Sequence, residues 1–375
     1  IPFITMILSL SLNGTAWKNK NNDDPSRATT SWESYSRDNH YATHDWIAEI
    51  ALMKIKNDPK WITKDGQEFW TDKRITIYLF GTEGPDFSDI IFYDFKGLPI
   101  IGMGDPTFHS VRFDNTTQAY IKMDIRDALN GITDVLNGKK TQKKEWEGLT
   151  TVLAKGDCDA AAFYMGMLSH YIADLGCFPH TISMDNAHHA NYEIKIAERT
   201  DCAVGLKHNT FTESARYECF HINLAFPLKT LITSPTALAL KLAYDTRFGA
   251  KTTRGECDAE WMEGMLYNIN WINIDDDSWR YWAHNDNEYK FLNRVEKSLQ
   301  HSVEAVANAL NWVIDTHLKY HKELECKCSE GETNTKSKSR QRFLTDYLFY
   351  FMWLEVGMFA ALYTFAVALT PLKPA

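Results

Sequence analysis

The chain has 375 residues, of which 44% are hydrophobic and 24% charged, so it is long and apolar enough to bury at least one core. Its net charge of −9 argues against a nucleic-acid backbone as the main partner, because such partners select basic surfaces. The seven cysteines include no CxxC pair, which excludes the usual zinc-finger and redox spacings. In an oxidising compartment some of them should form disulfides, whose connectivity the sequence leaves open.

Residues 1–16 have the pattern of a secretory signal peptide. The segment is apolar at its start, and the small residues Gly14 and Ala16 suit cleavage after Ala16. The alternative is a buried N-terminal strand. Cleavage would make Trp17 the new N-terminus and would direct the chain into the secretory pathway. The sequon at Asn115 would then be a usable glycosylation site.

Residues 17–322 are predicted to form one mainly α-helical domain. Apolar residues recur at helical spacing in "THDWIAEIALMKI", and "AAAFYMGMLSHYIADL" is apolar on nearly all faces, as expected of a central buried helix. A long amphipathic helix is predicted over residues 293–318. Residues 81–120 contain closely spaced Gly, Pro, Asp and Asn, which predicts loops with short extended pieces.

The C-terminal end is predicted to anchor the protein in a membrane. Residues 347–369 are apolar, with Glu355 as the only charge, and are long enough to cross a bilayer. The alternative is a buried core helix or an oligomer interface. Residues 323–346 are predicted to be a polar linker, and residues 370–375 a short tail.

The stretch "SHYIADLGCFPHTISMDNAHHANYE" contains four of the 13 histidines. His170 and Asp174 are four residues apart on the predicted central helix, so their side chains project from one face. Burying such a pair is costly unless something compensates, and zinc binds both kinds of group. His180 follows a Phe-Pro break, and His189 and Glu193 repeat the spacing of four. The pattern therefore predicts a metal site.

Three upstream residues are weaker candidates for the same site. His44 begins a predicted helix, Asp86 lies in the loop "GTEGPDFSD", and His109 lies in "DPTFHSVRFD". Taken singly, loop residues of these types are more often solvated than bound to a metal. His188 is offset by about 100° from His189 on a helix, so it is not included among the ligands.

In these segments the chain resembles the zinc-dependent phospholipases C, the family of the bacterial lecithinases and alpha-toxin. The resemblance rests on a Trp at the mature N-terminus and on "THDWI", "GTEGPDFSD", "FHSVRFD", "SHYIADLGCFPH" and "HHANYE", which occur in the family's order across roughly residues 17–320. It implies an all-α fold, a single multi-helix domain of the phospholipase C/nuclease type with a trinuclear zinc cleft. The predicted C-terminal hydrophobic helix falls outside the resemblance.

The resemblance also implies the ligands of three zinc ions. The first ion would be bound by Asp86, His109, His170 and Asp174. The second would be bound by His180, His189 and Glu193. The third would be bound by His44, by Asp174 as a bridge, and by the α-amino and carbonyl groups of Trp17.

Two features depart from the family pattern. Trp17 lies 27 residues before His44, a longer gap than usual. Trp32 lies 12 residues before His44 and fits the usual gap better, but it would need a second cleavage. Lys20 stands three residues after Trp17, where the family has a glutamate that meets a choline headgroup. The resemblance therefore does not imply a preference for choline.

The implied reaction is hydrolysis of a phospholipid at a membrane surface. Zinc lowers the pKa of bound water toward about 7 and so supplies a hydroxide that attacks phosphorus. The products would be diacylglycerol and a phosphorylated headgroup. The resemblance implies that Asp86 is the general base, and Phe87 beside it is expected to form part of the headgroup wall.

Two alternative functions remain open. A zinc-dependent single-strand nuclease shares the fold and the three-zinc cluster, but those enzymes have an aspartate as the final ligand where this chain has Glu193. A non-catalytic, membrane-tethered protein could use the same metals only to hold its fold. We expect a lumenal or extracellular protein anchored by residues 347–369, with no nucleic-acid partner.

Overall fold

The computed structural model divides the chain into two compact units, Ile1–Lys327 and Cys328–Ala375. All residues that the structure describes belong to the first unit. They are Trp32, Tyr35, and residues 41–86, 92–93, 99–100, 109–114, 116–122, 127–140, 145–182, 192–193, 196–197, 200, 220–228, 234–248 and 286–327. The predicted signal peptide, the sequon at Asn115 and the apolar segment 347–369 lie outside them. Among the described residues, no helix is both long and apolar enough to cross a membrane.

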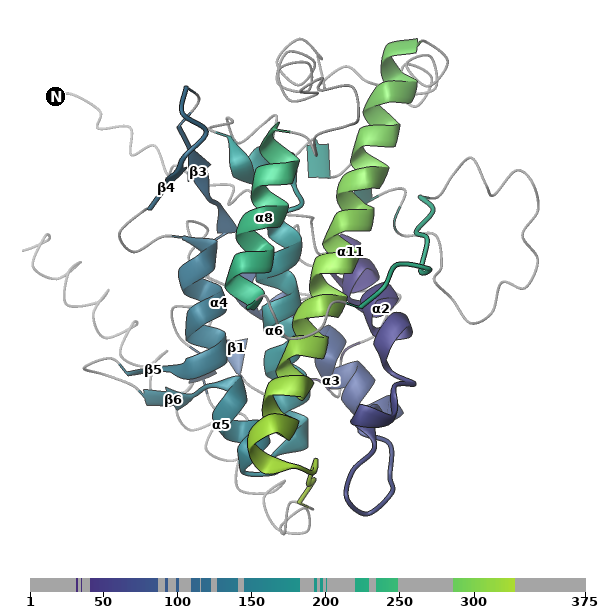
Figure 1. Cartoon of the computed structure of the whole chain (residues 1–375), viewed down its shortest axis with the longest axis vertical. Coiled ribbons are helices and arrows are strands. Elements are labelled where there is room, and N and C mark those ends of the chain that lie inside the picture. Colours follow the sequence, from purple (N-terminus) through teal and green to yellow (C-terminus); the bar gives the residue numbers. More distant parts are fainter. Residues whose placement is uncertain are drawn as a thin grey trace, which may run out of the picture. The chain divides into compact units, whose positions relative to one another are not determined.

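Helices dominate the described residues, so the prediction of a mainly α-helical domain is confirmed (Figure 1). The α-helices are α2 (Thr43–Ile55), α3 (Asp72–Glu83), α4 (Ala128–Asn137), α5 (Leu149–Ala154), α6 (Cys158–Asp174), α8 (Pro235–Phe248) and α11 (Asp286–His321). The short 3₁₀ helices are η4 (Pro59–Trp61), η5 (Gly84–Asp86) and η7 (Phe178–Thr181).

The strands form three small antiparallel pairs. The first pair is β1 (Phe92–Tyr93) with β2 (Pro99–Ile100), the second is β3 (Arg112–Phe113) with β4 (Tyr120–Ile121), and the third is β5 (Gly138–Lys140) with β6 (Glu145–Glu147). The first two pairs are the short extended pieces predicted within residues 81–120.

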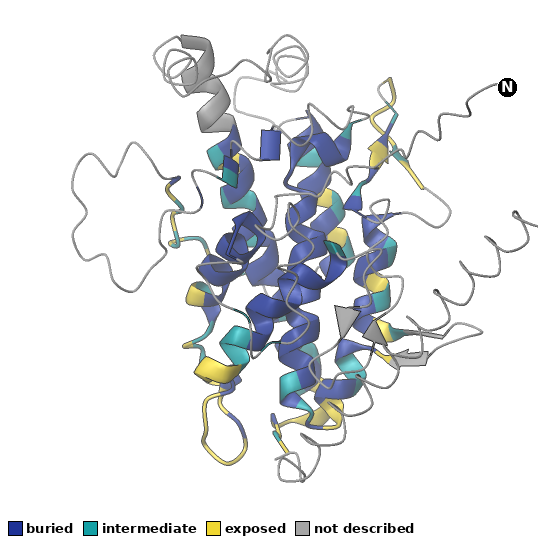
Figure 2. Cartoon of the chain, turned by 180° about the vertical axis from the view of Figure 1, so that it is seen from behind, coloured by how far each residue is buried: buried dark blue, intermediate teal, exposed yellow. Residues whose placement is uncertain are grey.

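Helix α6 is the predicted central buried helix. Its residues are almost all buried, and it contacts α2, α3, α4, α5, α8 and α11 (Figures 1 and 2). The side chain of Asp157 caps its first turn by accepting a hydrogen bond from the Ala160 N–H. The helix ends at Asp174, and Gly176 and Pro179 follow, two residues that do not favour its continuation.

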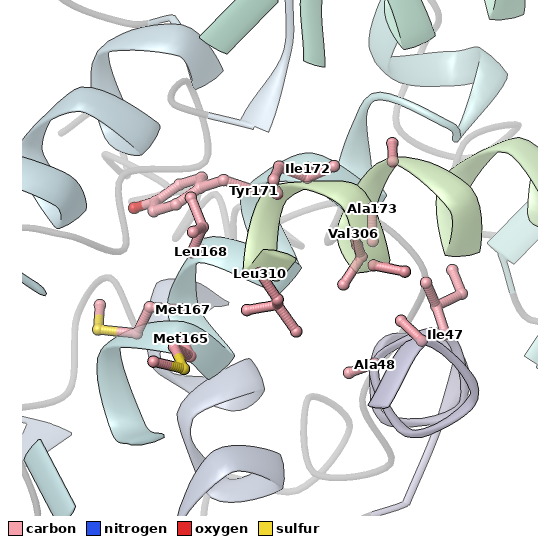
Figure 3. Packing of buried hydrophobic residues seen from close by; sticks show 14 of the residues in the cluster. Ile47, Ala48, Met165, Met167, Leu168, Tyr171, Ile172, Ala173, Val306 and Leu310 are labelled. Carbon is pink, nitrogen blue, oxygen red and sulfur yellow. The ribbon is translucent and has the colours of Figure 1, made fainter. Parts of the chain in front are cut away.

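Helices α2 and α11 pack against each other and against α6. Helix α2 has the bounds of the predicted segment "THDWIAEIALMKI", and α11 includes the predicted amphipathic helix. Both helices pack against α6, and Figure 3 shows apolar side chains of all three helices in this part of the core, among them Ile47, Ile172 and Val306. All three of these side chains are fully buried. Burial of this kind contributes about 1.5–3 kcal/mol for each large apolar side chain.

Helices α3 and α6 run in the same direction and approach closely through two glycines. A Cβ on Gly81 would lie 2.2 Å from the Phe163 carbonyl oxygen, and a Cβ on Gly166 would lie 2.0 Å from the Tyr78 carbonyl oxygen. Only glycine therefore fits at this contact. Gly81 lies inside α3, so the prediction that loops begin at residue 81 was wrong. Gly81 allows the two helices to pack closely. A sequence pattern does not distinguish a glycine with this role from a glycine in a turn.

The last described residues, 323–327, are bonded to and packed on the helical unit. Cys326 forms a disulfide with Cys158 at the start of α6, and the Lys327 N–H donates to the Gly156 carbonyl. Leu324 is buried. The first part of the predicted linker thus packs on the domain, and the compact unit extends to Lys327, beyond the expected end at residue 322.

Candidate metal centre

Four separate segments bring candidate ligands to one end of α6. Because α3 and α6 run parallel, Asp86, which follows α3, reaches the same end as Asp174, the last residue of α6. His44 lies in the first turn of α2, as predicted. His109 precedes β3, and the Val111 N–H donates to the His180 carbonyl at 3.1 Å, which holds this segment against η7. The side chains meet only because of this tertiary arrangement.

The orientation of His170 is fixed by a backbone group. Its Nδ1 lies 2.6 Å from the Thr82 carbonyl oxygen, which can only accept, so Nδ1 carries the proton. In the neutral ring, Nε2 therefore has a lone pair. This Nε2 lies 3.4 Å from Asp86 Oδ1 and 3.3 Å from Asp174 Oδ2. A metal-binding histidine is commonly held in this way through its other nitrogen.

The two oxygens of Asp174 face different histidines. Oδ1 lies 2.9 Å from His44 Nε2, and Oδ2 lies 2.6 Å from His109 Nδ1. Oδ2 also faces His170 Nε2. The His44 and His170 rings stack with their centroids 3.8 Å apart. The carboxylate thus lies between the His44 ring on one side and the His109 and His170 rings on the other.

Burial and mutual attraction shift the pKa values of this cluster. Burial alone would raise the pKa of Asp174, but the neighbouring His170 and His109 rings hold it well below its usual value. Burial alone would lower the pKa of His109, but the Asp174 and Asp86 carboxylates raise it to about 9. Burial and the nearby His170 ring lower the pKa of His44. Burial raises the pKa of Asp86 despite the surrounding histidines.

Buried nitrogen and oxygen atoms of this cluster lie close enough together to hold a metal ion. His170 Nε2 lies 3.4 Å from Asp86 Oδ1, 3.3 Å from Asp174 Oδ2 and 3.1 Å from His109 Nδ1. These separations are near the roughly 3.3–3.4 Å between the ligand atoms of a tetrahedral zinc ion with bonds of about 2.0–2.1 Å. His109 Nδ1 lies 2.6 Å from Asp174 Oδ2, which is the distance of a direct hydrogen bond. In addition, His44 Nδ1 is buried and has no hydrogen-bond partner among the described residues. The other ring nitrogen, Nε2, is the one that faces Asp174.

A second group of potential ligands lies beside the first. His180 Nε2 is 3.4 Å from Glu193 Oε1, and both side chains are buried. The Cys177 thiol completes this group, with the three ligand atoms within 4.8 Å of one another. The His180 and His109 rings are 6.3 Å apart at their centroids, so the two groups are neighbours. Glu193 lies in helical backbone, as its predicted spacing from His189 requires.

The predicted site residues divide into two sets. The structure brings together seven of them: His44, Asp86, His109, His170, Asp174, His180 and Glu193. Trp17, His189 and Phe87 lie outside the described residues. The alternative N-terminal residue Trp32 packs its ring 5.4 Å from Lys73 Nζ, near the start of α3, the opposite end from Asp86.

The sequence reasoning missed Cys177. The spacing C-x-x-H in "CFPH" places a thiol one short turn before His180, and this signal could have identified it. A CxxC criterion does not detect a mixed pair of Cys and His.

Two buried acidic residues, Asp45 and Glu83, lie next in sequence to His44 and Thr82, which belong to or support the metal cluster. Asp45 follows His44 and accepts hydrogen bonds from the Tyr35 and Thr82 hydroxyl groups and from the Ala42 N–H. Burial, and then the negative charge of Glu83, raise the pKa of Asp45 to about 8. These contacts hold the first turn of α2 against the end of α3, and so they position His44.

No protein-family model matches the sequence, and no curated protein matches it. The resemblance to the zinc-dependent phospholipases C therefore rests on the sequence segments given above.

Proposed function

We propose that the protein is a zinc-dependent phosphodiester hydrolase of the phospholipase C type. The observation that carries the proposal is the position of Asp174. Its Oδ1 faces His44 and its Oδ2 faces His109 and His170, an arrangement that supports the bridging role implied by the resemblance. Segments that are far apart in the sequence thus place the implied ligands of two ions around one carboxylate.

The residues of the cluster would hold the metal ions in defined places. Asp86, His109, His170 and Asp174 would bind one ion, and His44 with Asp174 would bind another. When bound, zinc supplies a Lewis acid for the phosphate oxygens and lowers the pKa of water. The carbonyl of Thr82 orients His170, and Asp45 anchors the turn that carries His44. Such supporting contacts typically change metal affinity or activity by about 10–100-fold.

Asp86 is proposed as the general base. Its side chain is buried, although the residue as a whole is partly exposed. It lies on η5, which follows α3, and its side chain faces the His170 and His109 rings. In the metal-free chain, burial raises the pKa of this carboxyl.

A phospholipid is favoured over a nucleic acid by two features. The net charge of −9 disfavours a polyanionic backbone. The ligand next to His180 is Glu193, as in the phospholipase pattern, whereas the nucleases have an aspartate. The disulfide between Cys158 and Cys326 supports an oxidising compartment, in agreement with the proposed secretory location.

The test compares substrates and variants of the full-length protein. Zinc-loaded protein should hydrolyse vesicles of mixed phospholipids, phosphatidylcholine among them, and leave single-stranded DNA intact. Asp86→Asn should lower kcat by about 10²- to 10⁴-fold, the usual contribution of a general base. The matched control is Asp65→Asn, the same change at an exposed turn, which should keep full activity.

Three results would contradict the proposal. Cleavage of DNA with no hydrolysis of any phospholipid would favour the nuclease. Full zinc loading with no activity on either substrate would favour a structural role for the metals. Equal activity of Asp86→Asn and Asp65→Asn would remove Asp86 from the mechanism.

A further inference from the structure

Cys177 and His180 occupy one short turn. Cys177 caps η7, and its carbonyl accepts the N–H of His180 at 3.1 Å, a contact between residues three positions apart. In a 3₁₀ turn, side chains three positions apart lie on the same side. Pro179 within the turn restricts its backbone and gives it a fixed shape. The thiol and the imidazole are therefore presented together by local structure.

Glu193 meets this pair from a separate segment. Its Oε1 lies 3.4 Å from His180 Nε2, close to the separation of about 3.3–3.4 Å that a tetrahedral zinc ion imposes on nitrogen and oxygen ligands. The Cys177 sulfur lies within 4.8 Å of both atoms. A zinc–sulfur bond is longer, about 2.3 Å, so the sulfur is expected to stand further from its fellow ligands.

The charge of the group also suits a divalent cation. Cys177, His180 and Glu193 are each at most 2% exposed. A carboxylate and a neutral imidazole alone would leave a buried zinc ion with one uncompensated positive charge. A thiolate in addition to the carboxylate makes the site neutral overall, which lowers the cost of burying the ion.

We propose that Cys177 supplies a thiolate ligand to the metal ion held by His180 and Glu193. The inference rests on the metal centre of the proposed function, and it assigns this pocket a mixed Cys/His/Glu ligand set. Binding would release the thiol proton to solvent.

The test uses cobalt in place of zinc, because a thiolate–cobalt bond gives a near-ultraviolet charge-transfer absorption that nitrogen and oxygen ligands do not give. The full-length protein loaded with cobalt should show this absorption. Cys177→Ser should lose it and should bind about one metal ion fewer per chain, as measured by elemental analysis. The matched control is Ser302→Ala, a small buried residue that packs against the same turn beside Gly176. It should keep both the absorption and the metal content.

The outcomes separate this inference from the proposed function. Cobalt-loaded wild type without the absorption, or Cys177→Ser that keeps it, would overturn the cysteine ligand even if phospholipids are hydrolysed. The absorption in a protein that hydrolyses no phospholipid would keep the cysteine ligand and reject the phospholipase. Equal loss of metal in Ser302→Ala would show that packing of the turn, and not the thiolate, holds the ion, and would also overturn the proposal.

Discussion

The two ends of α6 are held in place by different means. At its N-terminal end, Cys158 is joined to Cys326 by a disulfide, and Asp159 forms ion pairs with Lys73 and Arg74 near the surface. At its C-terminal end, His170 and Asp174 are fully buried among other ionisable groups. One end contains interactions that stabilise the fold, whereas the other contains groups that are costly to bury.

This difference indicates that the C-terminal end of α6 is the end that has a functional role. A fold under selection for stability alone has little reason to gather buried carboxyl and imidazole groups at one point, because each needs compensation. The cluster also has a buried nitrogen, His44 Nδ1, without a partner among the described residues. A bound cation would compensate the gathered carboxyl and imidazole groups. Four substitutions test this contrast between the two ends of α6. They are given in order, from the largest expected effect to the smallest.

Asp174→Asn should have the largest effect. It keeps the size of the side chain but removes the charge that faces His44 and His109. We expect kcat/KM to fall by more than about 1000-fold and the zinc content to drop, because two ions lose a ligand. Asp159→Asn is the matched control at the other end of the same helix. It should keep activity and zinc and cost about 1 kcal/mol at most. Retention of full zinc content by Asp174→Asn would rule out the bridge.

Cys158→Ser should affect stability without affecting the metal. The disulfide closes a loop with a sequence separation of 168 residues, and removal of such a bond typically costs about 2–5 kcal/mol. Thermal unfolding should show a lower Tm, while the zinc content and kcat of the folded protein stay unchanged. Cys326→Ser and the double variant should match the single variant. Loss of zinc in any of the three would contradict the separation of the two ends.

Gly166→Ala tests the contact that connects the two ends. The added Cβ would lie 2.0 Å from the Tyr78 carbonyl oxygen, so α3 must shift away from α6. Overpacking of this kind costs about 1–3 kcal/mol. Because α3 leads to Thr82 and Asp86, zinc affinity should fall as well, by roughly 10-fold. Thr76→Ala, at a partly exposed position on α3, is the control. Unchanged zinc affinity in a destabilised Gly166→Ala would show that the site does not depend on this contact.

Asp45→Asn should change the pH dependence of stability. The pKa of Asp45 is about 8 in the folded chain and about 3.9 in an unfolded one, because burial and Glu83 disfavour the charge. A raised carboxyl pKa means that its contribution is complete below pH about 4 and is lost as the pH rises toward 8. Relative to wild type, the zinc-free variant should therefore gain stability with rising pH, by up to about 1 kcal/mol per pH unit. Unfolding curves from pH 5 to 8 with a constant difference would contradict this.

Local patterns determined much of the fold in advance. The helical spacing of apolar residues located α2, α6 and the core part of α11, and the Phe-Pro break before His180 coincides with η7. The spacing of four between His170 and Asp174 placed both on one helix face. These features depend on neighbours in sequence, so a single segment contains the information.

Other features depended on contacts between distant segments. That Gly81 packs inside a helix, that Cys158 pairs with Cys326, and that Asp45 has a raised pKa all follow from neighbours far away in sequence. The same holds for the meeting of His44, Asp86 and His109 at the end of α6. The sequence by itself identified the histidine and carboxyl groups that could bind a metal, but not Cys177. Only the parallel packing of α3 on α6 decided that their ligand atoms come within reach of one another, because it places the ends of both helices at one point.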